Sequence, residues 1–555
     1  MVRATFSGFN TALSALQANQ KRLDITGQNL SNMNTAGYTR QQLEASSLNY
    51  TNPVSHYSNG NETAVGFGVS MDRVSQIRDP YLDIQYRSQS ADCSYTNRLQ
   101  TALNSLSKVL DETTISGIRQ AFDDVQSTLT SMQDPAKVSD PIYESELRTK
   151  MQSVCNLFNQ ASRQITQAEQ NEFQRLTGEG SSEQGDVQKI NDILRQIGDL
   201  NVQIKRNQVA GHPSLELQDE RNLLLDELSG YIPVETRYYK DDAHSGNNAY
   251  DYDANGAVIG KKDWPDDLEV SMNYIDAQGK SQKLILVNGS DLGADGLTKN
   301  YGQLSVLNRD HKPAASVSDP ANISIKFEKA PSYQVNGQAA TDVYAELKGI
   351  HFEGGSLQAS LDMLQKKGTG NVINGSVDDV RGYQYYSEKL DQLADTFAKS
   401  MNASNNGNNH KDQNLLSNST DDSTNGITAG NIGISKGWTS GTIHISTDGT
   451  NRTDTILDMI AAMKDTKKLN GKTFADYMNN LSTQLASDSS SNQTALKTGT
   501  TVLNSIQDSR DSLSGVSLDE EATNMMAYVS AYNAASRLMT ALDEVLNTLI
   551  SNTGA

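Results

Sequence analysis

The part of this 555-residue chain that looks most like a ligand site is the acidic run Asp251-Tyr-Asp253-Ala-Asn255-Gly256-Ala-Val258. Its alternating Asp and Asn side chains match the first eight positions of an EF-hand loop, which binds Ca²⁺ through oxygen ligands. The twelfth position, where a bidentate Glu would complete the loop, is Lys262. Asn-Gly between two strands also forms a type I′ hairpin turn. The sequence therefore favours a hairpin over a calcium site.

Other residue types that could do chemistry are scattered. The seven histidines are too far apart in the sequence for metal-ligand spacing, and no HExxH motif occurs. Neither GxSxG nor a P-loop is present, and Gly66-Phe-Gly68 is too short to hold a phosphate. We therefore expect no enzyme: no catalytic residues, no metal site and no cofactor.

Composition limits the partners. Net charge is −20, with a pI near 4.8 and a mean hydropathy of −0.58. Binding to nucleic acid or to an anionic membrane needs a basic face, so neither is expected. Cys93 and Cys155 read as isolated thiols. Residues 1–10 lack the apolar segment of a Sec signal, so any secretion is expected to use another route.

Both ends of the chain carry apolar residues at the three- and four-residue spacing of a coiled-coil seam. An isolated helix of about 25 residues is only marginally stable in water, so each end needs a partner. We expect the ends to pair, neighbouring copies to extend the bundle, and the seams to stay unpaired until assembly. The N-terminal seam comprises Phe6, Phe9, Leu13, Leu16, Leu23 and Leu30. The C-terminal seam comprises Met525, Tyr528, Tyr532, Ala535, Met539, Leu542, Leu546 and Leu549.

Between the seams, helical spacing gives way to strand-like alternation from about residue 231 to 350 and then returns. The pattern predicts an α+β multidomain fold. Residues 1–45 and 515–555 form a terminal coiled coil, and 231–350 form an independent, inserted, β-rich outer domain. Residues 46–230 and 351–514 form a discontinuous long-helix bundle with a polar, weakly β segment near 403–450. Helices are expected over 4–33, 355–366, 377–402, 453–465 and 473–513, and weak strands over Ile432–Ile434 and Thr442–Ile445.

Segments at both ends resemble bacterial flagellar axial proteins. The N-terminal motif lies within residues 29–40, and Ser514-Gly515-Val516-Ser517-Leu518-Asp519-Glu520-Glu521 is similar to the C-terminal signature. The helical block at 93–230, the helix at 473–513 and the run Leu217-Gln-Asp219-Glu-Arg221 look like the family of flagellar hook-associated protein 1. The N-terminal motif positions are Asn29, Asn32, Asn34, Thr35, Gly37, Tyr38 and Arg40.

The resemblance implies a structural subunit that joins the hook to the filament and self-associates in a ring or helical layer. It implies four further partners: the hook protein, hook-associated protein 3, a cytoplasmic export chaperone and the flagellar type III export apparatus. It also implies an extracellular location in the flagellum after a transient cytoplasmic stage.

Two other classes remain open at this point. One is another axial protein, such as hook-associated protein 3 or a hook- or rod-like protein. The other is a flagellar scaffold with an enzymatic insertion at 231–350, although that segment shows no nucleophile–base or metal constellation.

Overall fold

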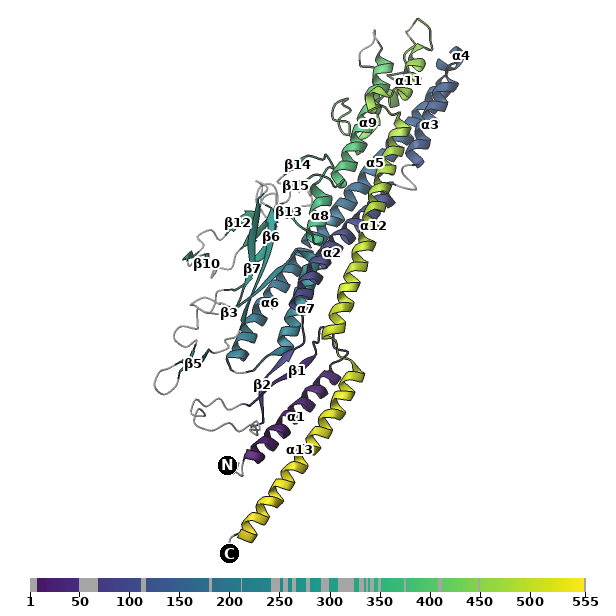
Figure 1. Ribbon diagram of the computed structural model, residues 1–555. Coiled ribbons are helices and arrows are strands. Elements are labelled where there is room, and N and C mark those ends of the chain that lie inside the picture. Colours follow the sequence, from purple (N-terminus) through teal and green to yellow (C-terminus); the bar gives the residue numbers. More distant parts are fainter. Residues whose placement is uncertain are drawn as a thin grey trace.

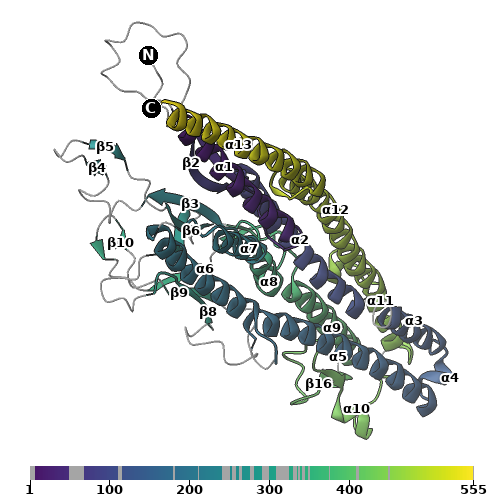
Figure 2. The same ribbon diagram turned by 90° about the horizontal axis from the view of Figure 1, so that it is seen from below.

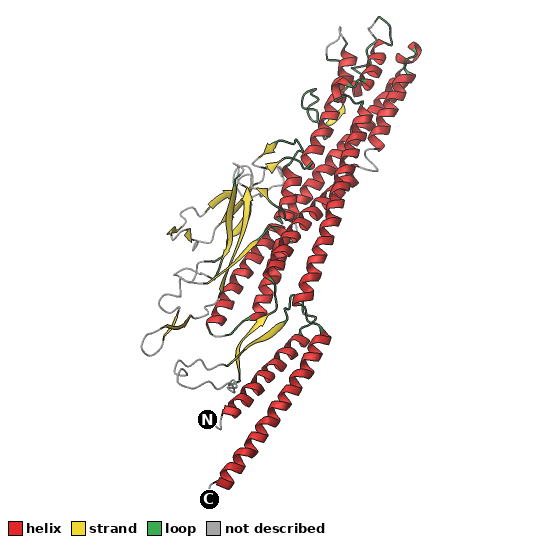
Figure 3. Cartoon of the chain, in the orientation of Figure 1, coloured by secondary structure: helices red, strands yellow, loops and turns green. Residues whose placement is uncertain are grey.

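The protein is an elongated stack of long helices with a β-sheet on one flank and both termini at one end (Figure 1). The termini lie on a helix pair that projects from the rest of the chain (Figure 3). The computed structural model describes residues 7–48, 68–110, 116–178, 182–210, 212–240, 250–252, 258–261, 266–275, 280–290, 299–307, 324–328, 334–335, 338–339, 344–347, 351–373, 376–407, 412–447 and 450–553.

The helical body contains the longest internal helices, and their ends follow from local sequence. The Asp140 side chain accepts a hydrogen bond from Ile142 N–H at the start of α5, and Gly178, at φ 75°, ends that helix. The body comprises α2 (Pro80–Leu110), α3 (Ser116–Ser131), α4 (Pro135–Val138), α5 (Pro141–Thr177), α6 (Asp186–Val209), α7 (Leu215–Tyr231), α8 (Ser356–Gln365), α9 (Tyr383–Asn406), α10 (Lys436–Ser440), α11 (Asp454–Lys464), a 3-10 turn (Lys467–Leu469) and α12 (Phe474–Ser514).

An aromatic cluster joins the two sequence-distant halves of the body. Phe122 of α3 lies with its ring centroid 5.2 Å from that of Phe397 on α9 and 5.5 Å from that of Phe474 on α12. All three rings are almost fully buried. The body is therefore one unit built from both sides of the β-rich segment.

The β-rich segment centres on β6, which pairs antiparallel with β3, β7 and β13. Apolar Leu268, Val270 and Met272 alternate along β6 with polar Asp267, Glu269 and Ser271. All six residues are buried, so both faces of this strand are covered. The strands of this segment are β3 (Glu235–Lys240), β4 (Tyr250–Tyr252), β5 (Val258–Lys261), β6 (Asp266–Ile275), β7 (Ser281–Asn288), β8 (Gln303–Leu307), β9 (Ser324–Glu328), β10 (Gln334–Val335), β11 (Gln338–Ala339), β12 (Tyr344–Leu347) and β13 (His351–Phe352).

The sheet is not an independent unit, which differs from the expectation for 231–350. It packs on α6 (Figure 2), and its buried residues belong to the same apolar cluster as those of α6 and α7. The Asn201 side chain on α6 donates to the carbonyls of Leu268 and Gly289, at 3.1 Å each. The α6 face is apolar because it carries part of this shared core.

Gly302→Ala is expected to test that shared core. A Cβ at Gly302 would lie 2.0 Å from Phe327 Cζ, and the Phe327 ring is fully buried. Overpacking of this kind costs about 1–3 kcal/mol, and the loss should lower the denaturation midpoint of both the sheet and the helical body. The control is Gly27→Ala on a helix, with no neighbour within 4 Å. A body transition unchanged by Gly302→Ala would show separate cores.

Three sequence predictions for the body need correction. The helix expected over 377–402 begins at Tyr383, because β14 (Val372–Ile373) and β15 (Ser376–Val377) pair and the Asp378 carboxylate accepts the backbone N–H of residues 367–369. Thr442–Ile445 is not a strand, since the N–H groups of Thr442 and Ile443, just after α10, donate to the carbonyl of Gly437 within that helix. The helical spacing of Tyr81, Ile84 and Ala91 predicts that these residues share one apolar face of α2, but Tyr81 and Ile84 are 64% and 54% exposed.

Two other segments follow the sequence interpretation more closely. β17 (Ile432–Ile434) forms, paired with β16 (Leu416–Asn418). β4 and β5 pair antiparallel around the acidic run, so the described flanks of that run are strands rather than EF-hand helices. Its turn, residues 253–257, lies outside the described residues.

Candidate assembly interface

The two ends of the chain form one unit. It consists of α1 (Ser7–Ser31), the hairpin of β1 (Gln41–Ser47) and β2 (Val69–Gln76), and α13 (Leu518–Thr553). α1 and α13 lie side by side in both views (Figures 1 and 2). A Cβ at Gly8 would lie 3.3 Å from Leu542 Cδ1, whereas the Arg22 guanidinium lies 5.6 Å from the Tyr528 ring centroid. Residue numbers rise on one helix as they fall on the other, so the pair is antiparallel.

The seam of α13 faces α1. Ala535 is 8% exposed, and Met525, Tyr528, Met539, Leu542 and Leu546 are half-buried in a helix that is otherwise almost wholly exposed. Tyr532 and Leu549, also expected in this seam, are 37% and 49% exposed. The heptad spacing therefore identified the covered face, but two of its positions lie at the edge.

The covered face of α1 is displaced from the seam expected there. Leu13 is 46% exposed, and Phe9, Leu16, Leu23 and Leu30 are only half-buried; Phe6 lies outside the described residues. Apart from Ile25, the most buried positions carry small or polar side chains, which allow close approach of α13 and the hairpin. They are Ala12, Ala18, Asn19, Ile25, Thr26 and Asn29.

The expectation that both seams are unpaired before assembly is wrong for this structure. α1 and α13 already pack against each other within one chain. The reason is geometric: the ends of α2 and α12 bring the two terminal segments together at one end of the body (Figure 1).

α13 has more apolar surface than α1 covers. Outside the seam, Met526, Leu538 and Val545 are 65%, 48% and 59% exposed, and Ile550 near the end is 65% exposed. Ser530, Arg537 and Glu544 share the side of the helix opposite the seam at helical spacing, and Met526 lies on that mostly polar side. A helix that is apolar on several sides is typical of one enclosed by more than one neighbour.

The N-terminal motif closes the end of α1. The Asn29 amide donates to the Gln41 carbonyl and its Oδ1 accepts from Gln41 N–H, both at 3.0 Å, and from the Tyr38 hydroxyl at 2.9 Å. Burial raises the pKa of Tyr38 well above its usual range, so the hydroxyl remains a donor. Gly37 has a φ of 77°, which favours glycine in this turn. Asn32 accepts a hydrogen bond from the Thr35 hydroxyl at 3.3 Å, and Asn34 is exposed.

The motif also reaches the C-terminal signature, 480 residues away along the chain. Arg40 Nη1 lies 2.7 Å from a Glu520 carboxylate oxygen, and Arg40 Nε lies 2.9 Å from one of Glu521. Arg40 N–H donates to the Ser514 carbonyl at 2.9 Å. The two signatures that the sequence offered separately thus form one contact.

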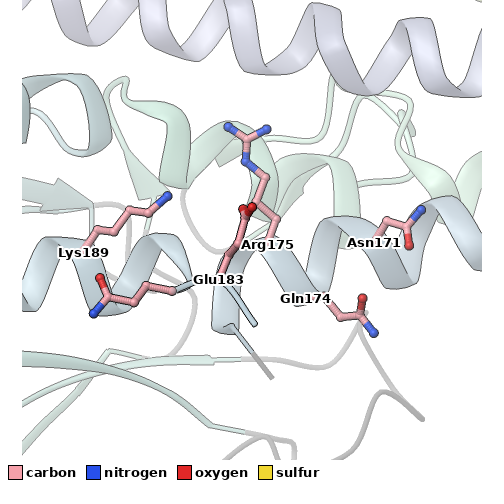
Figure 4. A pocket seen from close by; sticks show the side chains of 6 residues that line it. Asn171, Gln174, Arg175, Glu183 and Lys189 are labelled. Atoms are coloured by element: carbon pink, nitrogen blue, oxygen red, sulfur yellow. The ribbon is translucent and has the colours of Figure 1, made fainter. Parts of the chain in front are cut away.

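A polar pocket of about 370 Å³ lies elsewhere, beside the link between α5 and α6 (Figure 4). Its lining includes Arg175 and Lys189, whose nitrogens lie 3.6 and 3.7 Å from the Asp186 carboxylate. Its described lining residues include no Ser, Cys or His. Across the described ranges, no group of three or more His, Cys, Asp or Glu side chains is placed to hold a metal ion.

Comparison with known proteins decides the family. The family model described as "Flagellar hook-associated protein FlgK helical domain" matches residues 103–416, more than half of the chain. The chain belongs to the flagellar hook-associated protein FlgK family. Residues 9–39 match the model for flagella basal body rod protein, and 509–552 match that for the flagellar basal body rod FlgEFG protein C-terminal region. The ends are thus shared with rod proteins, and the helical middle separates this FlgK-family chain from the rod- or hook-like alternative.

Relatives in this family cover the chain to different extents. It is 29% identical to flagellar hook-associated protein 1 of Bacillus subtilis over 568 residues, which is 99% of each chain. It is 29% identical to the Salmonella typhimurium protein of that name over 230 residues, 41% of this chain and 38% of that one. The solved hook junction protein FlgK of Burkholderia pseudomallei gives a TM-score of 0.35 at 17% identity, covering 61% of this chain and 45% of that chain.

Family membership places the chain among structural proteins of the flagellum. It implies association with other rod and hook components. Among the described helices, none is both long and apolar enough to cross a membrane.

Proposed function

We propose that this chain joins the flagellar hook to the filament by self-associating through the outer faces of its terminal helices. The observation that carries the proposal is the apolar surface of α13 that α1 leaves uncovered, with Leu538 and Val545 roughly half exposed. Burial of such side chains contributes about 1.5–3 kcal/mol each, so a few neighbours around each pair would stabilise an assembly.

The layout of the molecule supports an arrangement in shells. The terminal pair projects from one end, and the sheet lies on the flank of the helical body (Figure 3). We place residues 1–45 and 515–555 innermost, 46–230 and 351–514 around them, and 231–350 outermost. Copies form a ring or helical layer between the hook protein and hook-associated protein 3.

The proposed route to that position is export. The chain passes, bound to a cytoplasmic chaperone, to the flagellar type III export apparatus and leaves through the flagellar channel. Its final location is extracellular.

Leu538→Asp is expected to block assembly without unfolding the chain. The side chain is 48% exposed, so an aspartate there is hydrated in the monomer but would be buried unpaired between copies. Purified chain should keep its melting temperature and lose self-association in sedimentation, and cells should carry hooks without filaments. The matched control is Ser530→Asp on the polar face of the same helix. Normal filaments with Leu538→Asp would contradict the proposal.

A further inference from the structure

The joint between the terminal unit and the helical body lacks an apolar core. Along the described chain, no fully buried hydrophobic residue lies between Ile25 and Ala91, or between Leu485 and Ala535. The main apolar cluster runs from Ala102 to Leu485 and includes no residue of α1 or α13. A cavity of about 810 Å³ opens at this joint. Apolar packing therefore does not set the angle between the two parts.

Six charged side chains fill the joint instead. We call Arg78, Asp83, Arg87, Asp219, Asp226 and Arg510 the joint network. It contains three cations and three anions, so it is charge-balanced. Its members come from α2, α7, α12 and the link between β2 and α2.

The first half of the network ties α12 to α2. Arg510 Nε lies 3.1 Å from an Asp83 oxygen, and Arg510 Nη2 donates to Asp226 at 2.7 Å. Its guanidinium also lies 4.2 Å from the Tyr86 ring centroid. Arg87 Nε donates to the other Asp226 oxygen at 2.8 Å. These contacts hold the end of α12, from which α13 departs.

The second half ties the body to the start of β1. Asp219 on α7 accepts from Thr39 N–H at 3.0 Å and from the Thr39 hydroxyl at 2.6 Å. Arg78 donates to both Asp83 oxygens and, at 3.3 Å, to Thr39 Oγ1. Thr39 and Asp219 are 3% and 6% exposed. Burial raises the pKa of Asp219, opposed by the Thr39 donors and by Arg78.

We propose that the joint network fixes the direction in which the terminal helix pair leaves the helical body, with Asp219 and Thr39 as positioning residues. Hydrogen bonds to charged groups are directional, and a buried charge that loses its partner is costly. Rotating the terminal unit would separate Thr39 from Asp219 and leave that carboxylate short of donors. The joint network lies within one chain, so this proposal does not depend on whether the terminal helices self-associate.

The test measures this direction in the full-length monomer. Spin labels on Thr494→Cys in α12 and Ser530→Cys in α13 occupy exposed sites, while native Cys93 and Cys155 are buried. The label-to-label distance distribution should be narrow in the otherwise unchanged chain. Asp219→Asn removes one of two acceptor oxygens, and Thr39→Val removes one donor. Both should broaden the distribution and move its mean while leaving the melting temperature of the body unchanged.

Two further variants separate positioning from stability. Thr39→Ser keeps the hydroxyl and should restore the narrow distribution. Glu172→Gln, in a buried ion pair of the body, should lower the melting temperature and leave the distance unchanged. Wild-type distributions in both Asp219→Asn and Thr39→Val would overturn the proposal, as would a Thr39→Ser chain that behaves like Thr39→Val. If Asp219→Asn fails to fold, the comparison of Thr39→Val with Thr39→Ser tests the proposal. Assembly is not part of the readout, so failure here is distinct from failure of the proposed function.

Discussion

Leu542→Asp and Leu16→Asp are each expected to leave the helical body folded and to abolish assembly. Leu542 lies against Gly8 in the contact between α13 and α1, and Leu16 is half-buried on α1. An unpaired carboxylate at either position costs several kcal/mol when the contact forms, because the charge must be removed from water. The body draws no buried apolar residue from either helix, so its melting temperature should not change.

The expected measurements differ from those for Leu538→Asp because Leu542 and Leu16 also take part in contacts within one chain. Purified Leu542→Asp should lose helical circular dichroism equivalent to the terminal pair while its body transition persists. Cells should carry hooks without filaments and shed flagellin into the medium. Glu544→Gln, on the polar side of α13, should behave as wild type. Unfolding of the body by either variant would mean that the terminal pair is part of its core.

The C-terminal seam could be predicted because heptad spacing persists over eight positions without interruption. A long helix with one regular stripe has one obvious face to cover, and α1 covers most of that face, with Tyr532 and Leu549 at its edge. The N-terminal stripe misled for the opposite reason. Leu13 is more hydrophobic than Ala12 and Asn19, so the spacing favoured it for the covered face. However, two helices approach closely where side chains are small, and Ala12 and Asn19 are the buried residues. The β1–β2 hairpin is also a second neighbour of α1. Spacing alone does not report the number of neighbours.

The joint network was beyond sequence reasoning. Except for Arg78 and Asp83, its ion pairs join residues far apart in the chain, such as Arg510 and Asp226 at a separation of 284. Carboxylates on helices are usually exposed, and nothing local distinguishes Asp219 from its exposed neighbour Glu220. The run around Asp219 was singled out by family resemblance. Its partners emerge only once α7, α2 and the start of β1 are placed together.

Glu172→Ala is expected to destabilise the body more than any surface change. Glu172 on α5 accepts from Arg98 Nε of α2 at 2.9 Å and pairs with its Nη2, and both side chains are 5% exposed. The Ser360 hydroxyl on α8 accepts a further bond from Arg98 at 3.2 Å. Removing the carboxylate leaves a guanidinium buried with one neutral partner, and breaking such a pair costs about 3–5 kcal/mol.

Replacing both partners shows whether the loss of stability comes from the unpaired buried charge or from the loss of the contact itself. Arg98→Met with Glu172→Leu removes both charges and keeps apolar volume, so the double variant should lie close to wild type or above it, since the charges no longer have to be desolvated. Asp124→Ala in the exposed pair with Lys150 is the control and should cost no more than about 1 kcal/mol. Urea denaturation of the full chain, followed by helical circular dichroism, ranks the three. If the double variant is as unstable as Glu172→Ala, the pair itself stabilises the body, and the cost does not come from the stranded charge.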